Sequence, residues 1–333
     1  MKKILNVLFI FICVICLTGC GKKTKQDIVN KIDKKINNLN GYKIEAKMQI
    51  VNGEDTYNYD VTTSYQKKDN YRVSLRNTTN NHEQIILKNE DGVYVITPRI
   101  NKSFKFQSNW PYNSSQAYIL QSIVRDMKND VNLKMKKNKD GYVFISKVNY
   151  RNTPNITYQK IFFDNNLNIE KITVYDKDNN AQIKVIFKSF DLKAKFKKNY
   201  FILEENMNMA TDDDQIENTG VLDEAVYPTY LPEGTYLDTE KTVDLDSGSR
   251  IILTFAGDES FMLVEETLAK SDDIEIVPTS GDLDMVLGTI AIVDDTSVSW
   301  QNDGVSYYLV SSTMSSKELV EVAKSMSAIP ISK

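Results

Sequence analysis

Cys20 is the residue whose type and surroundings point most directly to a chemical reaction. It ends the run Leu17-Thr18-Gly19-Cys20, which follows a basic start at Met1-Lys2-Lys3 and an apolar stretch from Ile4 to Leu17. A basic start, an apolar stretch and small residues at a cleavage site make up a secretory signal, and here the site ends in Cys, the lipobox pattern of bacterial lipoproteins. We predict that peptide 1–19 is removed and that the Cys20 thiol receives a diacylglyceryl group.

The alternative is that the apolar run remains as an uncleaved transmembrane helix. A membrane span needs about 20 apolar residues, and this run is shorter. Two acyl chains are enough for stable anchoring, since each buried CH₂ contributes about 0.8 kcal/mol. The sequence therefore predicts a protein lipid-anchored to the extracytoplasmic face of the cell membrane, with residues 20–25 as the lipidated tether.

Few other residues have types suited to catalysis or metal binding. Cys13 and Cys16 lie in the signal, so the mature chain would have no free thiol and no disulfide. The one histidine, His82, opens a strand-like run beside a glutamate, where a surface role is commoner than a role as general base or metal ligand. HExxH, GxSxG, Walker-type and GxGxxG motifs are missing from the sequence. We expect no enzyme activity, no cofactor and no metal site.

Charge is distributed unevenly along the 333 residues, whose formal net charge is −4. Residues 21–210 hold 33 Lys and Arg against 20 Asp and Glu, whereas residues 211–333 hold 6 against 25. Such asymmetry predicts two domains with different surfaces. Residues 211–220 are polar and acidic, so we place an acidic linker at 206–222 between domains at 26–205 and 223–333.

The first domain is predicted to be mainly antiparallel strands behind one helix. Thr24 and Asp27 have the spacing of a capping box, and the helix they begin would end near Gly41. Its apolar stripe is Ile28, Ile32, Ile36 and Leu39. Alternation of apolar and polar residues follows in eleven short segments, the first with Tyr42, Ile44, Ala46, Met48 and Ile50 on one side. This alternation predicts a sheet with one buried and one solvated face.

A second helix interrupts these strands, at residues 116–129, with Ser114 or Ser115 as its N-cap. Its stripe of Ile119, Ile123 and Met127 would face the sheet together with Trp110. A sheet of so many antiparallel strands rarely stays open without curling. We therefore predict a mainly β (α+β) protein whose first domain is a half-open antiparallel β-barrel with a helical lid.

The second domain is predicted to be a small α+β unit. A proline-punctuated segment at residues 227–234 leads into strands at 236–243, 250–255, 261–266, 289–293 and 307–312. Ser315 and Glu318 form a capping box for a terminal helix at residues 315–327, with an apolar stripe of Leu319, Val322, Ala323 and Met326.

The order of these elements behind a lipobox resembles the LolA-like family of outer-membrane lipoprotein carrier and sorting proteins. Residues 89–98, an aromatic strand ending in Pro98, share this resemblance, and residues 103–112 look like the version found in sporulation lipoproteins of Gram-positive spore formers. The chain from Tyr227 through Trp300 to the terminal helix is similar to DUF4367, a domain of unknown function.

The resemblance implies a half-barrel with an apolar cavity, which in the family carries lipid or the acyl chains of lipoproteins. Seven residues are the candidates for the lid and cavity: Tyr94, Phe104, Phe106, Trp110, Ile119, Ile123 and Met127. This chain departs from a soluble carrier because it carries its own anchor and a second domain. Transport between two membranes is therefore not expected.

Two functions remain open. The first is a lipid-anchored extracytoplasmic binding protein that holds a lipid or a lipoprotein acyl chain in the half-barrel, although the same residues could fill a solid core. The alternative is a non-catalytic docking or regulatory lipoprotein, related to sporulation or the cell wall, that binds an envelope protein partner. The uneven charge motivates the alternative. The extracytoplasmic location argues against nucleic acid as a partner.

Overall fold

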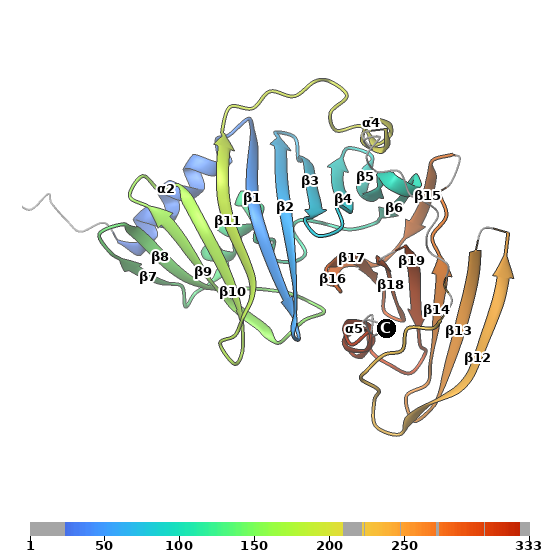
Figure 1. Ribbon diagram of the computed structural model, residues 1–333. Helices are drawn as coiled ribbons and strands as arrows, with labels where there is room; N and C mark the ends of the chain where they lie inside the picture. Colours follow the sequence, from blue (N-terminus) through green and yellow to red (C-terminus); the bar gives the residue numbers. More distant parts are fainter. Residues whose placement is uncertain are drawn as a thin grey trace, which may run out of the picture.

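The computed structural model describes residues 24–208, 222, 224–246, 248–270, 273–302 and 304–326. Two β-sheets make up most of the protein (Figure 1). We call residues 24–208 the N-terminal unit and the described residues from 224 to 326 the C-terminal unit. The predicted signal, Cys20 and most of the predicted linker lie outside the described residues.

The larger sheet combines strands from both units. Its strands are β1 (Gly41–Asn52), β2 (Asp55–Gln66), β3 (Asn70–Asn77), β4 (Glu83–Asn89), β5 (Gly92–Thr97), β6 (Lys102–Phe106), β7 (Lys134–Lys137), β8 (Gly141–Lys147), β9 (Ile156–Asp164), β10 (Ile169–Asp176), β11 (Ala181–Asp191) and β15 (Glu275–Thr279). They lie in the order β15-β6-β5-β4-β3-β2-β1-β11-β10-β9-β8-β7. Neighbours are antiparallel except β15 and β6, which are parallel.

The two faces of the larger sheet follow from the alternation in the sequence. In β1, Tyr42, Ile44, Ala46, Met48 and Ile50 are buried while the lysines and the glutamate between them are exposed. We call the face that carries Ile44 the inner face and the opposite one the outer face. The alternation that predicted a half-buried sheet is confirmed at this strand.

The helices of the N-terminal unit are α2 (Lys25–Asn37), α3 (Leu120–Asn129) and the short α4 (Leu203–Met207), with a 3₁₀ turn η1 (Pro98–Ile100). The capping box of α2 is formed as predicted, with Thr24 and Asp27 bonded to each other's backbone. α3 begins four residues later than predicted, and no side chain caps it. Ser115 instead accepts a 2.8 Å hydrogen bond from the backbone N–H of Asn149 in the β8–β9 loop, which holds residues 114–119 out of the helix.

The C-terminal unit forms the second sheet, which is antiparallel. Its strands are β12 (Thr235–Leu245), β13 (Gly248–Gly257), β14 (Phe261–Thr267), β16 (Asp282–Val286), β17 (Thr289–Val293), β18 (Ser297–Asn302) and β19 (Val305–Val310). They lie in the order β12-β13-β14-β19-β18-β17-β16. Helix α5 (Ser316–Lys324) packs on this sheet and has the predicted capping box of Ser315 and Glu318. Strands β15, β16 and β18 were not among those expected.

The structure confirms a mainly β protein, and its larger sheet is open, with β15 and β7 as its edge strands. The parallel pair of β15 and β6 departs from the predicted antiparallel arrangement. Two features account for burial of the apolar face without a closed barrel. Strand β15 of the C-terminal unit pairs with β6, so one sheet edge is covered by a strand from far along the chain. The inner face is covered by side chains from other elements, so its apolar residues are buried without closure of the sheet.

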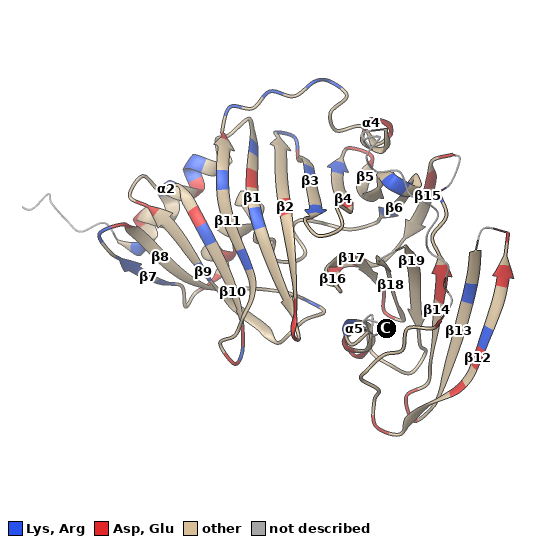
Figure 2. Cartoon of the chain, viewed as in Figure 1, with Lys and Arg blue, Asp and Glu red and all other residues tan. Residues whose placement is uncertain are grey.

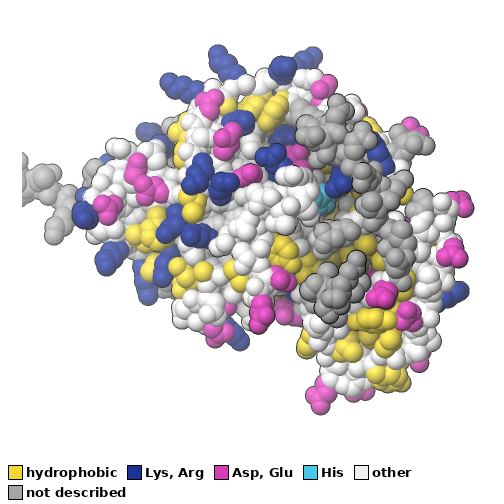
Figure 3. Space-filling view, in the orientation of Figure 1, with side chains coloured by type: hydrophobic (Ala, Val, Ile, Leu, Met, Phe, Trp, Pro, Cys, Tyr) yellow, Lys and Arg dark blue, Asp and Glu magenta, His cyan; other side chains and the backbone are white. Residues whose placement is uncertain are grey.

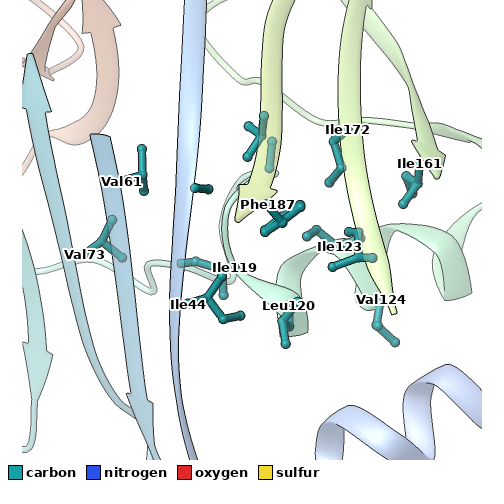
Figure 4. Packing of buried hydrophobic residues seen from close by; sticks show 14 of the residues in the cluster. Ile44, Val61, Val73, Ile119, Leu120, Ile123, Val124, Ile161, Ile172 and Phe187 are labelled. Carbon is teal, nitrogen blue, oxygen red and sulfur yellow. The ribbon is translucent and has the colours of Figure 1, made fainter. Parts of the chain in front are cut away.

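The main hydrophobic core lies on the inner face and draws on both units. Side chains from the sheet, including Ile44, Val61 and Val73, meet Ile119, Leu120, Ile123 and Val124 of α3 and the residue before it (Figure 4). Ile290 and Ile292 of β17 belong to the same cluster. The two stretches of sequence predicted as separate domains therefore share a core.

Candidate functional site

The candidate site is the inner face of the larger sheet and the segment that covers it. Trp110, Ile119, Ile123 and Met127, all predicted for the lid or cavity, are at most 1% exposed and lie in the inner-face core. The ring of Trp110 meets Tyr71 of β3 edge-on, with centroids 5.9 Å apart. The structure thus brings these four residues together on one face.

The covering segment, residues 107–119, is fastened to α3 mainly by Arg125, and Ser122 Oγ also accepts a 2.9 Å hydrogen bond from the backbone N–H of Gln116. Arg125 donates hydrogen bonds to the carbonyl oxygens of Pro111 (2.9 Å) and Ser114 (2.7 Å) and to Ser122 Oγ (2.9 Å). Two of these bonds hold the short stretch from Pro111 to Ser114, and the third, to Ser122 on α3 itself, orients the guanidinium. Charge-assisted hydrogen bonds are among the stronger ones in proteins, so this segment is a tied cover and not a loose flap.

The β16–β17 hairpin of the C-terminal unit closes the rest of the inner face. Ile290 and Ile292 are buried there, and Leu283 and Met285 pack beside them. The amide oxygen Oε1 of the buried Gln84 accepts hydrogen bonds from Thr289 Oγ1 (2.8 Å) and from the backbone N–H of Ile290 (2.7 Å). A buried amide paired in this way sets the register of the hairpin on β4, because a shifted hairpin would leave these groups unsatisfied.

Polar contacts surround this apolar interface. Asp282 of β16 accepts hydrogen bonds from Asn113 Nδ2 (2.6 Å) and from Arg151 NH1 (2.5 Å). Lys324 Nζ of α5 donates to Thr153 Oγ1 at 2.7 Å. The C-terminal unit is therefore held against the cover and against the β8–β9 loop as well as against the sheet.

The turn of the hairpin approaches the larger sheet closely. Gly288 has a φ of +68°, and a Cβ placed on it would lie 2.2 Å from a ring carbon of Tyr57 and 2.7 Å from the hydroxyl of Tyr59. A positive φ is easy only for glycine. The docked position of the hairpin therefore requires glycine at this residue.

What remains on the inner face is a small cavity of about 60 Å³. Its walls include Met48, Ile50, Ile183, Met285 and Ile290, with Trp110 and Asn113 at the cover. Pockets that take small molecules usually have volumes of about 300–1,000 Å³. In this closed arrangement the cavity has room for a few waters and not for an acyl chain.

The other predicted cavity residues lie in different places. Phe106 is buried in the inner-face core, and Phe104 packs against that core and borders Ile290 and Ile292. Tyr94 lies on the outer face, in a separate cluster with Ile85, Leu87 and residues of α4. The reason is the alternation in β5, which sends Val93 and Val95 to the inner face and Tyr94 to the other. Tyr94 is thus corrected to an outer-face residue.

Two buried carboxylic acids stand out electrostatically, one in each unit. Burial raises the pKa of Asp126 on α3 to about 6, against hydrogen bonds from Ser115 and Gln159 and the charge of Arg125. Burial also raises the pKa of Glu265 on β14 to about 7, although the carboxylate accepts bonds from the backbone N–H of Val226 at 3.0 and 3.1 Å. Asp126 lies on a helix of the N-terminal unit and Glu265 on a strand of the second sheet, and neither charge perturbs the pKa of the other.

The docked hairpin was not predicted from the sequence. A signal for it lies in β17, where Ile290 and Ile292 of the inner-face core alternate with Ala291 and Val293, which are buried on the other side of the strand. Four consecutive apolar residues, 290–293, in a strand buried at every position indicate a strand that is covered on both faces.

Neither a membrane-spanning helix nor a cluster of metal ligands is found among the described residues. Over those ranges, every helix is too short or too polar to cross a bilayer. In the same ranges, three or more His, Cys, Asp or Glu side chains nowhere gather into a group that could hold a metal ion.

The geometry defines a two-unit, mainly β protein whose open sheet is filled from within by its own helix and its own C-terminal hairpin. The family described as sporulation protein YdcC-like matches residues 1–201, and DUF4367, a domain of unknown function, matches residues 225–326. The chain belongs to the YdcC-like sporulation protein family. It is 38% identical over 317 residues to sporulation protein YdcC of Bacillus subtilis (strain 168), covering 95% of this chain and 94% of that one.

Solved structures show more distant likenesses. A MucA/MucB complex of Pseudomonas aeruginosa matches with 10% identity and a TM-score of 0.33, covering 90% of this chain and 97% of that chain. A LolA superfamily protein, NE2245 of Nitrosomonas europaea, matches with 11% identity and a TM-score of 0.32, covering 55% and 99%.

Proposed function

We propose that this chain is a lipid-anchored, non-catalytic docking protein on the extracytoplasmic face of the cell membrane, and that its partner is a protein of the cell envelope during sporulation. The anchor is the predicted diacylglyceryl group on Cys20. The family membership supports the link to sporulation. One structural observation carries the docking role, and it concerns the second sheet.

One face of the second sheet is buried against the larger sheet at one end and is exposed to solvent at the other. At the β16–β17 end it covers the inner face of the larger sheet. At the other end the register of β12, β13, β14 and β19 brings an apolar row to the surface. We call this row the apolar strip; it consists of Tyr236, Ile252, Met262, Val264, Tyr308 and Val310. Tyr236 is 58% exposed, Tyr308 44% and Met262 37%.

An exposed apolar row on a sheet marks an interaction surface, since soluble proteins rarely leave such rows uncovered. The strip belongs to the acidic part of the chain, where residues 211–333 carry 6 basic and 25 acidic groups. Acidic side chains predominate on the lobe that this unit forms (Figure 3). A partner with an apolar ridge flanked by basic residues matches this chemistry.

The test uses the full chain in sporulating cells. A photo-crosslinking residue replaces Tyr308 in one strain and Ile202 in another; Ile202 is 43% exposed and lies outside the strip, next to α4. We expect a discrete protein adduct from position 308 and none from 202. Met262→Ser with Tyr308→Ser should lower spore formation, and Ile202→Ser should not. Adducts from neither position, with normal spore formation in both variants, would refute the docking role.

Acyl binding on the inner face is the second candidate. The observation in its favour is that the 60 Å³ cavity is walled mainly by apolar side chains and borders the β16–β17 hairpin, so withdrawal of the hairpin would enlarge it. Native mass spectrometry of the mature chain in the absence of detergent, together with uptake of a fluorescent acyl probe, tests it. One lipid retained per chain would favour acyl binding over a purely docking role.

The anchor has its own test. Intact-mass spectrometry of the protein extracted from membranes should show a diacylglyceryl group on a chain that begins at Cys20. Cys20→Ala should abolish the added mass and release the protein from the membrane fraction. An unmodified mature chain would rule out the anchor.

A further inference from the structure

One end of the larger sheet is densely basic. Lys134, Lys136 and Lys137 of β7, the last strand of the sheet, and Lys139 in the following turn are all exposed. Over the described residues, none of these four lysines belongs to an ion pair. We call these four lysines and Val131, in the loop before β7, the basic edge. Figure 2 shows the lysines on β7 at one end of the molecule.

Val131 is the most exposed large apolar residue among those described. Its side chain is 91% exposed, and the next, Tyr236, is 58% exposed. An aliphatic side chain held in water costs free energy unless another phase covers it. Apolar side chains among lysines are typical of surfaces that enter the headgroup region of a bilayer.

The basic edge lies beside the start of the folded chain. Lys25 is the first residue of α2, and its Nζ donates a 2.6 Å hydrogen bond to the carbonyl oxygen of Leu133, within the loop that carries Val131. Lys25 lies five positions after Cys20 in the sequence, and an extended chain spans at most about 3.5 Å per residue. With Cys20 acylated, α2 therefore begins within about 17 Å of the bilayer surface. The tether itself adds Lys22 and Lys23.

We propose that the basic edge is the surface with which the protein rests on the anionic lipids of its own membrane. The proposal rests on the anchor at Cys20 for its geometry. The acidic C-terminal unit lies at the opposite end of the molecule (Figure 2), where an anionic bilayer would not repel it. Lysines on an edge strand also discourage pairing between sheets, but that role accounts neither for Val131 nor for the position of the edge beside the tether.

Binding to vesicles tests the proposal without the lipid anchor. The protein is the mature chain with Cys20→Ser, which keeps both hydrophobic cores. Co-sedimentation compares vesicles of phosphatidylcholine with vesicles that contain about one third phosphatidylglycerol. Each lysine near such a surface contributes about fivefold in affinity. We expect binding to the anionic vesicles alone, and at least a tenfold loss in K134Q/K136Q/K137Q/K139Q. Val131→Ser should cause a smaller loss.

The matched control is K193Q/K195Q/K197Q/K198Q. These lysines are equal in number and also exposed, but they lie in the segment after β11. The control should change binding less than threefold. Equal losses in both variants, binding without preference for anionic lipid, or binding to lipid-free cell-wall material alone would each overturn the proposal. Suppose that the membrane-extracted protein has no diacylglyceryl group on Cys20 but the Cys20→Ser chain still binds anionic vesicles. The anchor is then refuted, and the basic edge is retained as a lipid-binding surface.

Discussion

The two units cover their sheets differently. In the N-terminal unit the inner face is filled by α3, by the tied cover around Trp110 and by a hairpin from the other unit. In the C-terminal unit one face is filled by α5, and the other is divided between that same hairpin interface and the exposed apolar strip. The N-terminal unit therefore has its inner face covered within this chain, whereas the C-terminal unit has an exposed apolar strip, which we propose as the docking surface.

Core truncations show how far the two units fold as one body. Ile123 in the N-terminal core is 1% exposed and Leu253 in the C-terminal core is 0% exposed. Ile123→Ala and Leu253→Ala should each lower the free energy of unfolding by about 4 kcal/mol, through lost burial and the cavity left behind. Urea unfolding followed by tryptophan fluorescence measures this. A single transition in both variants would show that the docked hairpin couples the two cores. Two separate transitions would show that the two units unfold independently.

The buried acids predict a pH dependence with a different window for each unit. The pKa of Glu265 is raised from an ordinary 4.5 to about 7, so between these values the folded protein holds a proton that the unfolded chain has lost. The free energy of unfolding should therefore fall by about 3 kcal/mol as pH rises from about 4.5 to 7. For Asp126 the corresponding fall should lie between about pH 4 and 6.

Glu265→Gln and Asp126→Asn separate the two windows. Glu265→Gln should flatten the dependence of stability on pH between about 6 and 7, where only Glu265 contributes. Asp126→Asn should leave that range unchanged, and each substitution should reduce the slope between about pH 4.5 and 6, where both acids contribute. The measurement is urea unfolding at half-unit steps of pH. A slope that persists in both variants would assign the pH dependence to other groups.

Gly288 and Gly53 form a matched pair for the docked hairpin. Both have positive φ, +68° and +60°, but a Cβ on Gly53 would meet nothing within 4 Å. Gly53→Ala should cost about 1 kcal/mol from backbone strain alone. Gly288→Ala should cost about 2 kcal/mol more, because the added methyl group collides with Tyr57. Faster proteolysis at the junction of the units should accompany Gly288→Ala; equal effects of the two substitutions would mean that the turn does not contact β2.

Substitutions at the helix caps should have the smallest effects on stability, and they compare equivalent positions in the two units. Thr24 caps α2 and Ser315 caps α5, each in a complete capping box. Thr24→Ala and Ser315→Ala should each lower the free energy of unfolding by about 1 kcal/mol. Thermal unfolding by circular dichroism measures both. An effect at Ser315 much larger than at Thr24 would show that α5 holds the C-terminal unit together more than α2 holds the N-terminal one.

Sequence patterns correctly predicted those features that depend on residues close together in the chain. The capping boxes at Thr24 and Ser315, the alternation of β1, and the burial of Ile123 and Met127 on α3 follow from spacing within one element. The start of α3 was misplaced because Ser115 bonds to the distant Asn149 rather than to its own helix. Tyr94 was assigned to the cavity because it is aromatic, while the register of β5 places it outside.

Contacts between distant segments account for most of what the sequence did not reveal. Gln84 meets Thr289 and Ile290 about 200 positions later, and β15 meets β6 across a similar separation. Spacing carries no information about such pairs. The small volume of the inner-face cavity depends on them, so a half-barrel predicted from the first 200 residues looks emptier than the folded protein is.

The strand β15 makes the N-terminal unit depend on residues that are synthesised long after it. Glu275–Thr279 supplies the backbone partners of Lys102–Phe106. A protein shortened to residues 24–208 would leave these amides and carbonyls open to another molecule, and sheet edges of this kind recruit one another. Half of this chain, prepared alone, would be prone to self-association for a reason unrelated to its biology. During synthesis, the first unit stays incomplete until the residues of β15 have been made.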